Sequence, residues 1–259
     1  MKHNALKIIF LGHPKYAAAY KETLESAGHK FFVIKHFEKT KEIMENIEPD
    51  LGIIACFGKI IPENILKIPK YGFLNVHPSL LPRWRGPSPV RSALLAGETT
   101  TGVTIHITTA KVDAGDIIFQ KKFLVDPDDN YITLEERLFN EGAKALSDAI
   151  QKWINGDIKP RKQDESRASY SKKVCTEDGL IDWSRTPEEI LRQIKAFSPD
   201  PGVYTLIDEK RLKIKKAEII DGVLKLLIVQ PEGKKDMTGD AFFRGHREIL
   251  SKQLFKSFF

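Results

Sequence analysis

The stretch LKIIFLGHPKYAAAYKETLESAG, residues 6–28, contains the two kinds of segment from which the fold is built. The apolar run LKIIFL is short and suits a buried strand. Gly12 and Pro14 then open a helical segment that ends at Gly28, because proline is tolerated in a first helical turn and glycine commonly follows the last. These residues therefore predict a strand followed directly by a helix.

The same alternation continues over the next 130 residues or so. Strands are expected at 31–37, 51–58, 72–77, 102–108 and 117–125, and helices at 38–48, 61–69 and 133–156. Apolar strands that alternate with helices indicate an α/β domain with a mostly parallel sheet and helices on both faces.

The amino-acid composition changes after residue 155. Residues 156–172 are polar and almost free of large apolar groups, which is typical of a surface linker. Beyond them come a capped helix at 186–198 and three strand-like runs, GVYTLI, RLKIKKAEII and VLKLLIVQ. A small β-rich domain such as a five-stranded barrel fits this part. We expect a catalytic domain at 1–155, a linker at 156–172 and a C-terminal domain at 173–259.

Composition excludes several classes of protein. The 259 residues are 41% hydrophobic and carry a net charge of +6, which permits an anionic partner such as RNA without requiring one. No apolar run has the length of a membrane span, and the short run at residues 6–11 does not suit a signal peptide. Cys56 and Cys175 lie far apart with no metal-like spacing. We expect a cytoplasmic protein with no membrane association and no metal.

The glycine pattern argues against a bound nucleotide cofactor. Gly12 stands alone after the first predicted strand, so the G-x-G-x-x-G fingerprint of dinucleotide-binding domains is missing. The phosphate-binding pattern G-x-x-x-x-G-K-[ST] is missing too.

The segment LNVHPSLLPRWRGPSP, residues 74–89, holds the strongest candidate for a site. Asn75 and His77 are two residues apart in a predicted strand, so they face the same side. They also lie at its carboxyl end, where open α/β sheets bind ligands. An amide beside an imidazole suits acyl chemistry, because the amide stabilises an oxyanion and the imidazole moves protons near neutral pH.

A carboxylate partner is expected from AKVDAGDII, residues 110–118. This segment contains Asp113 and Asp116, and spacing alone leaves both open. The sequence offers no identifiable partner for three other histidines, and we expect structural roles for them: His13, His36 and His106. Trp84 lies between two arginines, which suits cation–π stacking at a surface.

Three sequence segments together resemble the folate-dependent formyltransferases. They are NVHPSLLPRWRGPSP, ALLAGETTTGVTI and VDAGDII. SLLPRWRG is most similar to the members of the family that act on methionyl-tRNA. The later segments LIDWSRTPEEILRQIKAFSPDPGVYT and LKLLIVQPEGKKDMTGDAFFRG resemble the C-terminal domain of the same members, so the resemblance runs from about residue 6 to about residue 247.

The resemblance implies a fold, a reaction and a set of site residues. The fold would be a Rossmann-like domain followed by a small OB-like barrel. The reaction would be formyl transfer from 10-formyltetrahydrofolate to the α-amine of initiator methionyl-tRNA, and DNA would not be a partner. Asn75, His77 and Asp113 match the catalytic residues, with the V-D-x-G context favouring Asp113 over Asp116. The residues that match the loop contacting tetrahydrofolate are Ser79, Leu80, Leu81 and Pro82.

A tRNA substrate would need cationic contacts to its phosphates. The candidates are Arg83 and Arg85 in the loop after the fourth strand, and Lys213, Lys215 and Lys216 in the C-terminal domain. An ordinary strand with a charged outer face would account for the three lysines equally well.

This chain looks like a shortened form of the family. Only EKTKEIMENIEPD, residues 38–50, stands where the family usually has a longer insertion with a basic loop. Three other functions stay open at this point: an enzyme that formylates the amine of a nucleotide-linked sugar, a hydrolase that releases formate from the same folate, and an RNA-binding relative without activity. The end of the chain, with Phe255, Phe258 and Phe259, has no clear counterpart in the family.

Overall fold

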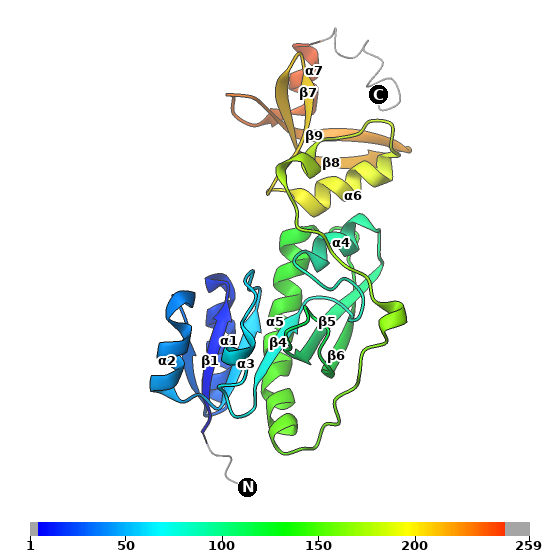
Figure 1. Cartoon of the computed structure of the whole chain (residues 1–259). Helices are drawn as coiled ribbons and strands as arrows, with labels where there is room; N and C mark the ends of the chain where they lie inside the picture. The colour runs from blue at the N-terminus through cyan, green and yellow to red at the C-terminus, as the bar shows by residue number, and fades with distance from the viewer. Residues whose placement is uncertain (1–4, 247–259) are drawn as a thin grey trace. The chain divides into compact units, whose positions relative to one another are not determined.

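The structure is a computed structural model that describes residues 5–246 (Figure 1). It divides into two compact units, each described separately below. The first comprises residues 1–89, 99–125 and 133–172, and the second comprises 90–98, 126–132 and 173–259. Within residues 5–246, no helix combines the length and the apolar character needed to cross a membrane. The phenylalanines at the end of the sequence lie outside the described residues.

A six-stranded sheet of order β2-β1-β3-β4-β5-β6 forms the centre of the first unit. The strands are β1 (Lys7–Gly12), β2 (Lys30–Val33), β3 (Leu51–Ala55), β4 (Phe73–His77), β5 (Thr100–Ile107) and β6 (Ile117–Leu124). The first four run parallel, whereas β4–β5 and β5–β6 pair antiparallel. The predicted α/β domain with a mostly parallel sheet is therefore confirmed.

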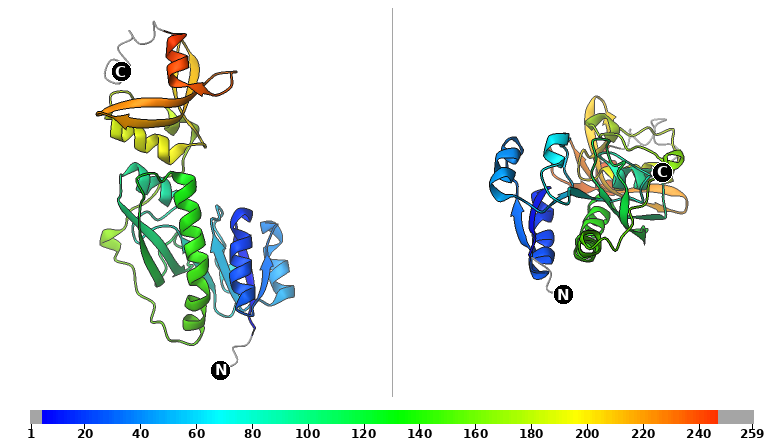
Figure 2. Two further views of the ribbon diagram at one scale, coloured as in Figure 1. Left: turned by 180° about the vertical axis from the view of Figure 1, so that it is seen from behind. Right: turned by 60° about the horizontal axis from the view of Figure 1, so that its bottom comes forward.

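Alternation along the strands creates two cores. Ile8 and Phe10 of β1 pack on one face with α1 (Pro14–Ser26) and α5 (Tyr131–Ile154), which Figure 2 shows on the same side of the sheet. Ile9 and Leu11 pack on the opposite face. That face is covered by the two short helices α2 (Thr40–Ile47) and α3 (Glu63–Leu66), which contribute Met44, Ile65 and Leu66.

The core under α2 and α3 extends over only part of that face of the sheet. Its strand residues come from β1, β3 and the first position of β4, together with Ile34 after β2. Along β4, Leu74 and Val76 belong to the α1–α5 core, so Asn75 and His77 point to the other face. Polar residues of β4 and β5 on that face are therefore covered by loops rather than by an apolar helix.

Residues 38–50 make a short connection between β2 and β3. A single 3₁₀ turn, η1 (Phe37–Lys39), leads directly into α2, which ends at Ile47 and is followed by the C-cap residue Glu48 with a φ of 52°. One turn and one two-turn helix thus occupy most of this short connection.

The second unit contains a four-stranded antiparallel sheet of order β10-β9-β8-β7. Its strands are β7 (Val203–Ile207), β8 (Lys210–Ile220), β9 (Val223–Pro231) and β10 (Met237–Thr238). Helix α6 (Pro187–Phe197) packs on β8 and β9, and α7 (Gly239–Arg244) packs on β9. Helix α4 (Pro89–Leu95) falls almost entirely in this unit as well. The β-rich C-terminal part is confirmed, although residues 173–246 supply four strands rather than five.

The polar segment 156–172 groups with the first unit. Isolated bridges join Arg161 to Ile117 and Tyr170 to Arg85. Its polar character reflects hydrogen bonding along the surface of the sheet domain, in addition to the exposure that the sequence predicts.

Candidate active site

Two neighbouring strands place four polar side chains on the face that the helices leave uncovered. The antiparallel register pairs Asn75 of β4 with His106 of β5, and His77 with Thr104. Val103 and Ile105 of β5 belong to the α1–α5 core, so Thr104 and His106 point away from it. Three of the four are buried, with Thr104 0%, His106 1% and His77 4% exposed, whereas Asn75 is partly exposed.

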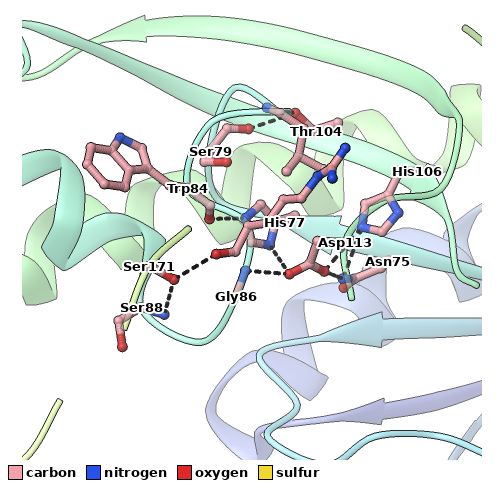
Figure 3. Close-up of polar contacts among 12 residues, drawn as sticks. Asn75, His77, Ser79, Trp84, Gly86, Ser88, Thr104, His106, Asp113 and Ser171 are labelled. Carbon is pink, nitrogen blue, oxygen red and sulfur yellow. Dashed lines mark hydrogen bonds and ion pairs between the residues drawn. The ribbon is translucent and has the colours of Figure 1, made fainter. Parts of the chain in front are cut away.

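Asp113 joins these strands from the turn between β5 and β6. Its backbone adopts a φ of 46°, a left-handed conformation that aspartate tolerates better than most residues. One carboxylate oxygen, Oδ1, accepts a hydrogen bond from Asn75 Nδ2 at 3.0 Å, and the other, Oδ2, accepts one from the Gly86 N–H at 2.8 Å. In Figure 3, Asn75, His77 and His106 converge on this carboxylate. The structure thus brings together the three residues that the sequence singles out.

His77 lies between two oxygen acceptors. Its Nε2 is 3.0 Å from the carbonyl oxygen of Trp84, and its Nδ1 is 3.6 Å from Asp113 Oδ2. A neutral imidazole donates from one nitrogen only, so the bond to Trp84 assigns the proton to Nε2 and leaves Nδ1 directed at the carboxylate. A second proton on Nδ1 would complete an ion pair with Asp113. This ring can therefore take up and release a proton within the cluster.

Opposing effects act on the protonation of the cluster. Burial lowers the pKa of His77, while Asp113 acts in the opposite direction without cancelling it. Burial would raise the pKa of Asp113, but His77, His106 and the Gly86 N–H outweigh it and hold that pKa well below its usual range. The resting site at neutral pH therefore contains an ionised Asp113 beside a neutral His77.

The sequence reasoning left His106 with a structural role, and the structure places it inside the cluster. Its Nδ1 lies 3.0 Å from the carbonyl oxygen of Ile107, and its Nε2 lies 3.2 Å from Asn75 Nδ2 and 3.5 Å from Asp113 Oδ1. The signal was present in β5, where Thr104 and His106 alternate with apolar residues. Only the pairing of β5 with β4 shows that these two face Asn75 and His77.

Thr104 anchors the loop after β4. Its hydroxyl donates to the Ser79 carbonyl at 2.6 Å and accepts from the Leu81 N–H at 3.2 Å. Gln120 Nε2 donates to the Leu81 carbonyl at 2.9 Å, and the peptide bond between Leu81 and Pro82 is cis. Leu80 fills the space beside Gly102, where a Cβ would lie 2.3 Å from its Cδ2. The loop predicted to contact folate, residues 79–82, is fixed beside the cluster by these bonds.

The two loop arginines have different environments. Arg83 is exposed, and its guanidinium lies over the Trp84 ring at 5.7 Å, as expected for a cation–π pair. Arg85 is 0% exposed, and all five of its N–H groups donate to Gln163, Glu165 or Tyr170. The prediction that Arg85 contacts an RNA phosphate is therefore wrong for this structure, because its charge is buried and fully paired.

The three candidate lysines of the second unit lie exposed on β8. The pairing of β8 with β9 shifts between Ile214 and Lys216, so Lys215 is the additional residue of a bulge. Lys215 forms an ion pair with Asp236 at 2.8 Å.

Comparison with known proteins defines the class to which this fold and site belong. The family model described as "Formyl transferase" matches residues 12–150, and the model described as "Formyl transferase, C-terminal domain" matches residues 173–221. The first match alone covers more than half of the chain and contains Asn75, His77 and Asp113. The chain belongs to the formyl transferase family.

Its curated relatives are named methionyl-tRNA formyltransferase. The protein of that name from Bacillus licheniformis is 38% identical, with 80% of this chain and 75% of the relative covered. The one from Chloroflexus aurantiacus is 32% identical, with 93% of this chain and 97% of the relative covered.

Solved structures share the fold at lower identity. HypX from Aquifex aeolicus in complex with tetrahydrofolic acid has a TM-score of 0.73 at 21% identity, covering 98% of this chain and 48% of HypX. Methionyl-tRNA formyltransferase from Clostridium thermocellum has a TM-score of 0.69 at 20% identity, covering 90% of this chain and 100% of that chain.

Proposed function

We propose that this protein transfers a formyl group from 10-formyltetrahydrofolate to the α-amine of initiator methionyl-tRNA. The observation that carries this proposal is the match to methionyl-tRNA formyltransferases over nearly the whole length of both chains, as with the relative from Chloroflexus aurantiacus. Catalysis would belong to residues 1–155, and residues 173–259 would contribute contacts to the tRNA.

The acceptor amine needs little activation. An α-amine has a pKa of roughly 7.7–8.0, and esterification of the neighbouring carboxyl lowers it further. The neutral amine would attack the formyl carbon, forming a carbon–nitrogen bond and leaving negative charge on the formyl oxygen. Asn75 supplies an amide N–H donor for that oxygen, and the Nε2–H of His77 would become a second donor if it exchanged the Trp84 carbonyl for the oxyanion. Stabilisation of the oxyanion is the interaction expected to lower the barrier most.

The donor of Asn75 is engaged within the cluster before the reaction. Its Nδ2 lies 3.0 Å from Asp113 Oδ1 and 3.2 Å from His106 Nε2. An amide nitrogen has two hydrogens, so meeting an oxyanion would require it to give up one of these contacts. The longer contact, to His106, is the one we expect Asn75 to exchange.

Proton transfer completes the reaction. The attacking nitrogen must lose a proton, and N10 of the folate must gain one as its bond to the formyl carbon breaks. His77 can accept the first on Nδ1, where the ionised Asp113 stabilises the imidazolium, and can return a proton to the leaving nitrogen. The charge of Asp113 thus favours the transient protonation that burial of His77 disfavours.

The folate donor would lie against residues 79–82. This loop adjoins His77 in sequence and is held by Thr104 and Gln120 through backbone atoms. A pre-ordered loop reduces the entropic cost of positioning the donor.

The test offers 10-formyltetrahydrofolate with initiator methionyl-tRNA and, separately, with a panel of amino-sugar nucleotides. We expect formylmethionyl-tRNA from the wild-type protein and none above background from His77→Ala. Formylation of an amino sugar with no tRNA product would contradict the proposed acceptor and leave the site chemistry intact. Release of formate without either acceptor would indicate a hydrolase.

A further inference from the structure

Residues 161–171, here called the strap, are hydrogen-bonded to the loop after β4. The Ser169 carbonyl accepts from the Arg85 N–H at 2.9 Å, and the Arg85 carbonyl accepts from the Ser171 N–H at 2.7 Å. The hydroxyl of Ser169 accepts from the Trp84 N–H at 3.0 Å. The strap therefore fixes the backbone whose Trp84 carbonyl contacts His77.

One side chain of the strap also reaches the turn that carries Asp113. Gln163 Nε2 donates to the backbone carbonyls of Asp113 at 2.8 Å and Gly115 at 2.7 Å. Its Oε1 accepts from Arg85 Nε at 3.1 Å and from Arg85 Nη2 at 2.8 Å. Both polar ends of the amide are thus engaged, one with the turn and the other with the buried guanidinium.

These contacts close a ring of bonds around the site. Gly86, the residue after Arg85, donates its N–H to Asp113 Oδ2, while Trp84, the residue before it, offers its carbonyl to His77. The side chain of Arg85 donates to Gln163, and Gln163 in turn donates to the backbone carbonyl of Asp113. Asp113 is consequently held at two places: Gly86 donates to its carboxylate, and Gln163 donates to its backbone carbonyl.

We propose that Gln163 is a positioning residue for formyl transfer, which fixes the turn of Asp113 against the Arg85 loop and so sets the distance between the Asp113 carboxylate and His77. This inference rests on the proposed function only for its kinetic readout. Gln163 acts through Asp113 and is not assigned a contact with folate or with the acceptor.

Loss of the amide would release the turn while leaving every reacting side chain chemically unchanged. The backbone carbonyls of Asp113 and Gly115 would lose the bond from Gln163, and Nε and Nη2 at one edge of the Arg85 guanidinium would lose their shared acceptor. The Asp113 backbone is already in a left-handed conformation, which persists only where its surroundings hold it. A shift of about 1 Å in a catalytic group can reduce a rate by about 100-fold.

The test replaces Gln163 with methionine, which keeps the length of the side chain and removes its hydrogen bonds. Gln230→Met in the second unit is the matched control, because Gln230 is also half-buried and donates to a single backbone carbonyl, that of Lys234. We expect kcat to fall at least tenfold in Gln163→Met, with KM for the folate donor within about twofold of wild type, and no change in Gln230→Met. Thermal unfolding establishes that each variant is folded at the assay temperature.

Nitrogen NMR of ¹⁵N-histidine-labelled protein gives a readout that requires no acceptor. The His77 ring signals, assigned by their loss in His77→Ala, should move in Gln163→Met and stay in place in Gln230→Met. An unchanged His77 spectrum with an unchanged kcat would overturn the proposal, as would a rise in KM alone. If the wild type fails to formylate methionyl-tRNA, the proposed function fails, and the NMR comparison still decides the role of Gln163.

Discussion

Asn75 carries the amide that the proposed reaction needs most. Its contacts with Asp113 and His106 hold the Nδ2 group in the cluster beside His77. Replacing Asn75 with alanine removes one oxyanion donor, and we expect kcat to fall by about 100- to 1,000-fold. Steady-state formylation assays measure this, with Asn64→Ala on the exposed surface of α3 as the control. A loss below tenfold would show that another group stabilises the oxyanion.

Asp113 makes the free energy of unfolding depend on pH in the acid range. Because the pKa of its carboxyl in the folded state lies below the unfolded value of about 3.9, the ionised group stabilises the fold. That contribution is present above the unfolded pKa and is lost as the pH falls below it toward the folded pKa.

Asp113→Asn should therefore be less stable than wild type at pH 6, and the difference should shrink as the pH approaches 3. Urea unfolding at several pH values measures the two free energies of unfolding. Asp116→Asn, in the same segment, is the matched control for removing a carboxylate outside the cluster. A difference that stays constant with pH would mean that Asp113 stabilises the fold by contacts independent of its charge.

At the scale of elements, α5 lies close to the strand that carries the site. A Cβ on Gly142 would be 2.4 Å from Val76 Cγ1 and 3.1 Å from Val103 Cγ2. Val76 stands between Asn75 and His77, so this close approach of the helix supports the strand directly behind the cluster. The absence of a side chain at residue 142 serves packing, at a cost in helix propensity.

Gly142→Ala should destabilise the protein although alanine favours helices by about 1 kcal/mol over glycine. Overpacking of a close contact typically costs about 1–3 kcal/mol, which outweighs that gain. Urea unfolding measures the change. Gly58→Ala, where no atom beyond the adjacent residues lies within 4 Å of the added Cβ, should change stability by less than about 0.5 kcal/mol. Equal or higher stability of Gly142→Ala would show that the helix can move away from the sheet.

For the whole molecule, tRNA binding would depend on charges that the second unit presents. Lys213 and Lys216 lie exposed on β8, whereas Lys215 is paired with Asp236. If the first two contact phosphates, each releases about one counterion on binding.

Lys213→Ala and Lys216→Ala should each weaken tRNA binding and lower the slope of log affinity against log salt by about 1. Filter binding or fluorescence titration over a range of salt concentrations measures that slope. Lys225→Ala, at another exposed position on β9, tests whether any exposed lysine has the same effect. Unchanged slopes in the first two variants would assign these lysines to an ordinary solvated strand face.

The correction at Arg85 shows what a sequence pattern leaves undecided. Arg83 and Arg85 are equivalent in the motif SLLPRWRG, yet one is exposed and the other is fully buried. The difference arises because Gln163 and Glu165, about 80 residues later in the sequence, accept hydrogen bonds from Arg85. Only the tertiary fold brings them close to the loop. A local pattern carries no information about such partners.

The sequence by itself determined the alternation of strands and helices, the placement of Asn75 and His77 at the end of a strand, and the family. The first two depend on neighbouring residues, because strand and helix periodicity are local properties. The family followed from the resemblance of whole sequence segments. Only the tertiary structure placed His106 opposite Asn75, buried Arg85 and joined the strap to the turn of Asp113. Each depends on strand register or on contact between residues distant in sequence, which a pattern of polar and apolar residues leaves open.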